Sequence, residues 1–103
     1  MNQFTIDIDQ DVLTLSLQGQ ITYEICPDMK KELEAELAAR KITMMKVDMS
    51  ATSFLDSHGI GILVMLHKLS GEPGRDLRIV SPSKEATIIL DLVGLLSIFT
   101  VEG

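Results

Sequence analysis

The polar run Asp56-Ser57-His58-Gly59 lies between Phe54-Leu55 and the apolar stretch Ile60–Leu66. Asp, Ser and His are the side chains of a serine-hydrolase triad, which raises the question of catalysis. Neighbouring residues of a helix point about 100° apart, so three consecutive side chains do not converge on one substrate atom. The strand-to-helix turn of hydrolases also requires Gly-x-Ser-x-Gly, whereas Leu55 stands two residues before Ser57. These features argue against an enzyme.

Histidine spacing argues against a metal site as well. The chain has two histidines, His58 and His67, nine positions apart, which places them on roughly opposite faces of one helix. The sequence contains neither Cys-x-x-Cys nor His-Glu-x-x-His, and no glycine-rich phosphate loop precedes a Lys-Ser or Lys-Thr pair. We therefore expect no metal and no cofactor, and we expect His67 to be an ordinary side chain at a helix edge.

The remaining interpretations treat this run as the start of a helix. Asp56 or Ser57 can accept hydrogen bonds from the first free backbone N–H groups, which is worth about 1 kcal/mol. A hydroxyl at that place, flanked by glycines, is also open to another protein. Phosphorylation of Ser57 would add about −1.5 to −2 charges, which we expect to meet free N–H groups and the positive end of the helix dipole. A docked partner would meet a hydrated dianion, so the modification could control association.

Composition narrows the classes of protein and partner. A length of 103 residues suits one domain over residues 1–103, and 46 % apolar with only 4 % aromatic residues implies an aliphatic core. The net charge of −6 argues against nucleic acid and anionic membranes, which attract Lys and Arg clusters. Cys26 is the single cysteine, which fits a reducing compartment; we expect it to be half-buried near a helix start.

No targeting or membrane segment is apparent. Met1 to Asp11 is acidic and alternating, unlike a signal peptide. The apolar run Ile60–Leu66 is far shorter than the roughly 20 residues that span a bilayer. We expect a cytoplasmic protein with no membrane insertion.

Hydrophobic periodicity predicts an α/β fold with the element order β-β-α-β-α-β-α-β. The first half comprises a strand at Phe4–Ile8, a turn at Asp9–Asp11, a strand at Leu13–Leu17 that Gly19 ends, a connector at Gln20–Glu24, a helix from Pro27 whose Met29, Leu33 and Leu37 face inward, and a strand at Met44–Met49. The second half begins with a largely buried helix at Ser57–Leu69, a break at Gly71–Gly74 and a strand at Leu77–Val80. A helix follows that is capped by Ser81-Pro82, has Gly94 after its end, and has an inner face of Ala86, Ile89, Leu90 and Val93. The last element is a strand at Ile98–Val101. Alternation after an initial hairpin predicts a mixed, mostly parallel sheet of about five strands with helices packed against it.

In this context the chain resembles the STAS domain of bacterial anti-sigma factor antagonists. The resemblance rests on Val47-Asp48-Met49-Ser50, on Ser53-Phe54-Leu55-Asp56-Ser57-His58-Gly59-Ile60-Gly61, on Gly19-x-Ile21-Thr22 and on Asp91-Leu92-Val93-Gly94-Leu95. It extends over nearly the whole chain in the same element order. Members often carry an acidic residue at the position of Thr22 and a small or hydroxylic one at the position of His58.

The resemblance implies partner switching by a protein that is a substrate and ligand, not a catalyst. The serine at position 57 would be phosphorylated by an anti-sigma factor that is a serine kinase of the histidine-kinase-like ATPase type. The unphosphorylated protein would bind that kinase, and a PP2C-type phosphatase would reset the switch. The expected partner-binding residues are Gln20, Ile21, Thr22, Tyr23, Glu24, Ser53, Phe54, Asp56, His58, Gly59, Ile60 and Gly61.

Two questions stay open at this point. His58 is either an exposed polar side chain or a group that binds a proton more tightly beside phosphoserine and partly neutralises it. The whole domain is either a phosphorylation-controlled module or a STAS subunit of a larger assembly, such as a lipid-transport or stressosome-like complex. In the second case the Ser57 region would be a docking surface without phosphorylation.

Overall fold

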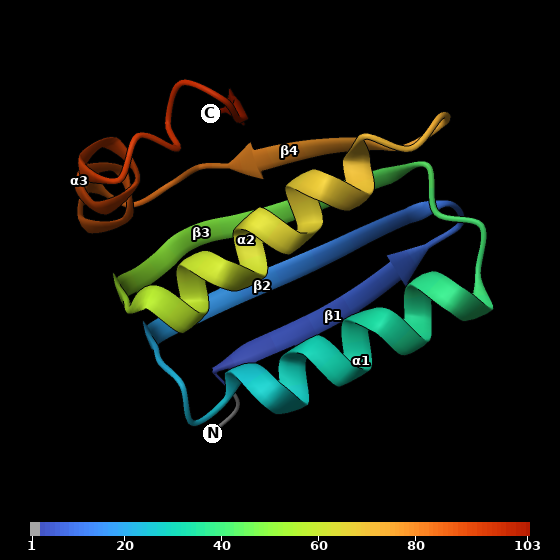
Figure 1. Cartoon of the computed structure of the whole chain (residues 1–103), viewed down its shortest axis with the longest axis horizontal. Coiled ribbons are helices and arrows are strands. Elements are labelled where there is room, and N and C mark those ends of the chain that lie inside the picture. The colour runs from blue at the N-terminus through green and yellow to red at the C-terminus, as the bar shows by residue number, and fades with distance from the viewer. Residues whose placement is uncertain (1–2) are drawn as a thin grey trace.

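Alternating apolar residues build a five-stranded sheet in the computed structural model, which describes residues 3–103 (Figure 1). The elements are β1 (Phe4–Asp9), β2 (Val12–Ile21), α1 (Cys26–Ala39), β3 (Met44–Leu55), α2 (Ser57–Ser70), β4 (Asp76–Val80), α3 (Lys84–Leu92) and β5 (Thr100–Glu102). The strands lie side by side in the order β1-β2-β3-β4-β5. Only the β1–β2 pairing is antiparallel within this sheet of residues 3–103. The predicted fold class and element order are confirmed.

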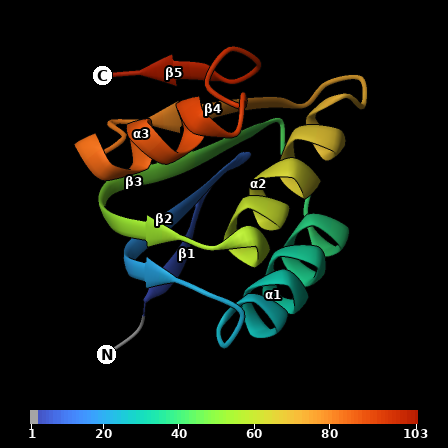
Figure 2. The ribbon, with the colours of Figure 1, turned by 60° about the vertical axis from the view of Figure 1, so that its left-hand side comes forward.

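Helices α1 and α2 lie next to each other on one face of the sheet, with both starts at the same end of the molecule (Figures 1 and 2). The predicted inner face of α1 is confirmed, because Met29, Leu33 and Leu37 are buried. Pro27 lies in the first turn, and no side chain caps this helix. The packing of α1 and α2 on the sheet buries an aliphatic core that includes Leu15 and Val47, as the low aromatic content predicts.

The second strand does not end at Gly19, contrary to the prediction. Gly19 has φ +74°. Gly19 pairs with Thr52 and Gln20 with Phe54, so the register skips Ser53 of β3 beside the glycine, and β2 continues to Ile21. Positive φ is accessible to glycine without steric cost, which lets the strand bend and resume pairing. Gln20 and Ile21 are therefore strand residues, and the connector comprises residues 22–25.

The third strand is longer than predicted. It runs past Met49 to Leu55 although residues 50–53 are mostly polar. Parallel pairing with β2 continues to Leu55, opposite Ile21. Thr52 is buried within it, and its hydroxyl donates to the carbonyl oxygen of Leu17 at 2.9 Å. A buried polar group is tolerated when it is hydrogen-bonded, so tertiary pairing overrides the local polar pattern.

Helix α2 was predicted to be largely buried, and it is fully buried along one stripe only. Gly59, Ile62, Leu63 and Leu66 are buried. The remaining apolar side chains, Ile60, Val64, Met65 and Leu69, are half-buried, and Gly61 is exposed. The reason is that the sheet and α1 cover only part of its circumference. An apolar helix surface remains in contact with solvent.

The C-terminal elements start later than predicted. The cap of α3 is Ser83, whose hydroxyl accepts from the N–H of Ala86 at 3.0 Å. Ser81 lies before the helix with φ +47°. Val93 is the residue that ends α3, with its side chain 46 % exposed, so it does not belong to the inner face. Gly94 follows with φ +76°, as predicted for a residue after a helix end.

The last strand is Thr100–Glu102 and starts later than the predicted Ile98. The N–H groups of Ile98 and Phe99 donate to the carbonyl of Leu95, so these two residues belong to a turn.

Candidate functional site

The start of α2 is set by Asp56. Its backbone is extended, and its Oδ1 accepts hydrogen bonds from the N–H groups of His58 at 2.8 Å and Gly59 at 3.0 Å. Of the two capping candidates, Asp56 is therefore the cap, and Ser57 is the first helical residue. A phosphate on Ser57 was expected to meet free N–H groups at the start of α2. Two of the first N–H groups of the helix already bind the Asp56 carboxylate. A phosphate on Ser57 would find those two groups occupied.

The second carboxylate oxygen of Asp56 binds the connector between β2 and α1. Oδ2 accepts from the N–H of Tyr23 at 2.9 Å, and the N–H of Asp56 donates to the carbonyl of Ile21 at 3.1 Å. The hydrogen bond from Gly59, with those from Tyr23 and His58 and the nearby imidazole, lowers the pKa of the Asp56 carboxyl below its ordinary value. One ionised side chain thus joins two segments 33 residues apart.

Gly59 allows α2 to approach the end of β2. A Cβ added there would lie 2.9 Å from the carbonyl oxygen of Ile21 and 3.1 Å from Cδ2 of Leu55. The first distance is shorter than real Cβ contacts, so a larger residue would displace the helix start or the strand end. Glycine at this position therefore has an internal steric reason.

Gly61 has no such reason. A Cβ added there would have no heavy atom within 4 Å, apart from the local helix backbone and chain neighbours. Glycine inside a helix costs about 1 kcal/mol relative to alanine. Because position 61 has no side chain, the surface of α2 there lies close to the helix backbone, although internal packing does not require a glycine.

Ser57 lies next to Gly61 on the surface of α2. Its side chain is exposed, and its hydroxyl forms no hydrogen bond with the residues that the structure describes. A groove on the α1 side is lined by Ser57, Gly61 and Met65 together with Cys26, Pro27, Lys30, His58 and Ile62. On the other side, Ser57, Gly61 and Met65 border a second groove with Ile60, Val64, Lys68 and Leu69. The hydroxyl thus stands between apolar grooves.

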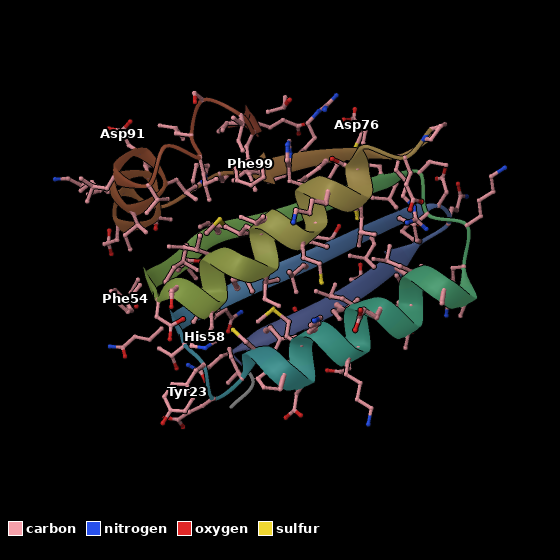
Figure 3. All side chains as sticks on the ribbon, in the orientation of Figure 1. Tyr23, Phe54, His58, Asp76, Asp91 and Phe99 are labelled. Atoms are coloured by element: carbon pink, nitrogen blue, oxygen red, sulfur yellow. The ribbon has the colours of Figure 1, made fainter. Side chains whose placement is uncertain are left out.

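Aromatic and imidazole rings surround this end of the molecule. Figure 3 places Tyr23, His58 and Phe54 together at the end where α2 begins. Tyr23 and Phe54 are 61 % and 45 % exposed. The ring centroids of Tyr23 and His58 are 6.1 Å apart, and Nδ1 of His58 is 3.7 Å from Oδ2 of Asp56. Exposed aromatic side chains of this kind are enriched in protein–protein interfaces.

Most of the predicted partner-binding residues reach the surface. Gln20, Tyr23, Glu24, Ser53, Phe54, His58 and Gly61 are exposed, and Thr22, Asp56 and Ile60 are half-buried. Ile21 and Gly59 are buried. Their contribution is to position the connector and the helix start. Partner binding by the whole set stays a prediction.

The sequence interpretation missed several residues that line the grooves. Met65 follows Ser57 and Gly61 at intervals of four residues, so helical spacing could have found it. Lys30 comes from α1, and no local pattern links it to Ser57. Cys26 is buried rather than half-buried, and burial, with a smaller effect of Asp56, raises the pKa of its thiol.

His67 lines a different groove, which shares no residue with the two grooves beside Ser57. Its ring is half-buried and packs edge-on against Phe99, with ring centroids 5.5 Å apart. Within residues 3–103, no three His, Cys, Asp or Glu side chains are grouped so that they could hold a metal ion. None of the helices in this range has the length and apolar character to cross a membrane.

Family comparison covers the same residues. The STAS domain model matches residues 3–103. The chain belongs to the STAS domain family. Among curated relatives, this STAS domain is similar to the anti-sigma F factor antagonist of Paenibacillus polymyxa, with 19 % identity over 96 % of this chain and 85 % of the relative.

Solved structures agree with this STAS fold. The anti-sigma factor antagonist SpoIIAA in its unphosphorylated form has 18 % identity and a TM-score of 0.80, covering 97 % of this chain and 87 % of that one. The Bacillus cell fate determinant SpoIIAA in its phosphorylated form has 18 % identity and a TM-score of 0.74, covering 97 % and 90 %. An anti-sigma factor antagonist from Mycobacterium paratuberculosis has 22 % identity and a TM-score of 0.80, covering 96 % and 83 %. At these identities the likeness shows the fold.

Proposed function

We propose that this STAS domain is a binding module controlled by phosphorylation of Ser57, of the anti-sigma factor antagonist type. In the unphosphorylated state it binds an anti-sigma factor that is itself a serine kinase. The observation that carries the proposal is the free, exposed hydroxyl of Ser57 between the grooves of α2. The module is a substrate and ligand, and it acts in the cytoplasm.

The docking surface comprises the exposed residues among 20–24, at the end of β2 and in the connector, together with the end of β3 and the solvent side of α2. Its apolar contribution comes from Tyr23, Phe54 and the half-buried side chains beside Gly61. Burial of such side chains is the main favourable term in association. The low surface at Gly61 lets the kinase backbone come close to Ser57.

Phosphorylation transfers the γ-phosphoryl group of ATP to Oγ of Ser57. A bond between phosphorus and Oγ forms, the bond from phosphorus to the β–γ bridging oxygen breaks, ADP leaves, and the hydroxyl proton passes to a base of the kinase. The product carries a strongly hydrated group between apolar grooves. An exclusion of about 2–3 kcal/mol weakens binding about 30- to 150-fold, which releases the partner. A PP2C-type phosphatase restores the hydroxyl by hydrolysis, which transfers the phosphoryl group to water and releases inorganic phosphate.

Variants at position 57 test the proposal. Tagged Ser57→Ala and Ser57→Glu proteins are used to capture partners from the source cells. Ser97→Glu is the control, because Ser97 is exposed and lines neither groove beside Ser57. The captured protein is then purified and titrated against each variant. We expect a kinase whose affinity is retained by Ser57→Ala and Ser97→Glu and is lowered at least tenfold by Ser57→Glu.

Incubation of the wild-type protein with the purified kinase and Mg-ATP should place phosphate on Ser57, as located by mass spectrometry. A kinase that binds but leaves Ser57 unmodified would contradict the switch. Stable copurification with a transporter or scaffold, unaffected by Ser57→Glu, would favour the STAS subunit of a larger assembly instead.

A further inference from the structure

The backbone at the start of α2 offers little new stabilisation to a phosphate. Asp56 already accepts from the N–H groups of His58 and Gly59, and the N–H of Ile60 donates to the carbonyl of Asp56. The Asp56 carboxylate is itself a negative charge beside Ser57. Like charges at this range repel. Stabilisation of a phosphate must therefore come mainly from cationic side chains near Ser57.

The groove on the α1 side of Ser57 supplies such side chains. Lys30 of α1 and His58 of α2 line it together with Ser57, and its lining contains no acidic residue. Both helix starts lie at this end of the molecule (Figure 1), and Figure 3 shows His58 there. The juxtaposition depends on the packing of α1 against α2.

Lys30 is available for such a contact. Its side chain is exposed, and it forms no ion pair with any residue in the described range 3–103. The neighbouring Lys31 lines a different groove, between β1 and α1, which it shares with the acids Asp28 and Glu32. Lys30 and Lys31 are adjacent in sequence and face different chemical environments, which makes them a matched pair.

We propose that Lys30 and His58 form a receiving site for the phosphate of phosphorylated Ser57, holding it in the groove between α1 and α2. The inference rests on the proposed function in assuming that Ser57 is modified. It adds how the switch works: the phosphate occupies the groove by ionic contacts with this chain, and so blocks the place where a partner's apolar side chain would lie. Apart from these two groups, the charged or titratable side chains near the site are Asp56, which opposes the phosphate, Tyr23, whose ring lies beside His58, Cys26 and Lys68. Burial raises the pKa of the Cys26 thiol, and Lys68 lines the other groove.

The test uses the whole chain with phosphoserine incorporated at position 57 by genetic code expansion, so no kinase is needed. Phosphorus NMR follows the second ionisation of the phosphate as the pH is raised at low salt. A cation at about 5 Å in a water-like dielectric changes such an ionisation by about half a pH unit. We expect Lys30→Gln and His58→Gln each to move the phosphate titration upward by about that amount.

Lys31→Gln and Lys68→Gln are the controls and should leave the titration within a tenth of a pH unit or so of the parent. The proposal is overturned if Lys30→Gln and His58→Gln titrate like the parent, or if Lys68→Gln produces the larger shift, which would place the phosphate in the other groove. All four side chains are exposed or line open grooves, so the fold should be retained, and backbone amide spectra check it. A kinase that never modifies Ser57 would defeat the proposed function and leave this titration unaffected, so the two failures are distinguishable.

Discussion

The two glycines at the start of α2 provide the sharpest test of the site, because they occupy the same helix two residues apart and have opposite surroundings. Gly59→Ala places a methyl group 2.9 Å from the carbonyl oxygen of Ile21 and 3.2 Å from its Cγ2. Gly61→Ala places the same methyl group where no heavy atom lies within 4 Å, apart from the local helix backbone and chain neighbours. The chemical change is identical, so any difference between the variants reports the surroundings.

The expected magnitudes follow from these distances. Replacing glycine by alanine within a helix stabilises it by about 0.5–1 kcal/mol, which applies in full to Gly61→Ala. For Gly59→Ala the same gain is opposed by overpacking, which costs about 1–3 kcal/mol. The methyl group also displaces the backbone that donates to Asp56, at a further cost of about 1 kcal/mol. We expect Gly59→Ala to be destabilised by about 1–3 kcal/mol and Gly61→Ala to be stabilised by up to about 1 kcal/mol.

Urea unfolding followed by circular dichroism measures both free energies, and equal m-values show that the transitions are comparable. Partner binding gives the second readout. Gly61→Ala should weaken binding of the unphosphorylated protein although it makes the fold more stable, since the methyl group raises the surface next to Ser57. The steric account of Gly59 is refuted if both variants gain stability. The docking role of Gly61 is refuted if Gly61→Ala binds the partner with unchanged affinity.

Two further predictions concern the hydrogen bonds that position the site. Asp56→Asn should lose the hydrogen bond from Tyr23 and lower the stability of the fold near neutral pH. The pKa of Asp56 is lower in the folded than in the unfolded state, so its contribution to stability is present above about pH 4 and is lost as the pH falls through the folded pKa. The stability difference between Asp56→Asn and wild type should therefore shrink in unfolding curves measured in acid. A difference that stays constant down to pH 2 would contradict the ionised cap. Thr52→Val should cost about 0.5–1.5 kcal/mol by removing the buried bond to Leu17, whereas Thr5→Val on exposed β1 should have a smaller effect in the same urea assay. Equal effects of the two threonine variants would show that the buried bond contributes nothing.

Local signals in the sequence were sufficient for the element order and for the start of α2. Alternating Phe4, Ile6 and Ile8, and Met29, Leu33 and Leu37 at intervals of four, each reflect a repeat that a single element imposes on its own residues. Capping at Asp56 is equally local, because a side chain can reach N–H groups two and three residues ahead. The same holds for the exposed first-turn position of Ser57.

Other features could not be predicted because partners distant in sequence create them. The extension of β3 through polar residues depends on pairing with β2, and the limited burial of α2 depends on how much of it the sheet and α1 cover. Gly19 was interpreted as the end of a strand, whereas it is a residue with positive φ inside β2. A glycine in a sequence does not show whether strand pairing resumes after it.

The sequence by itself therefore determined the type and order of the strands and helices, and that a serine hydroxyl stands at a helix start, since repeats and caps among neighbouring residues fix those properties. Tertiary packing alone decided that Oδ2 of Asp56 reaches Tyr23, that Gly59 must be glycine while Gly61 need not be for the fold, and that Lys30 and Ser57 line one groove. The physical reason is that these contacts join segments whose separation in space is set by the packing of α1, α2 and the sheet. No local repeat in the sequence encodes that separation.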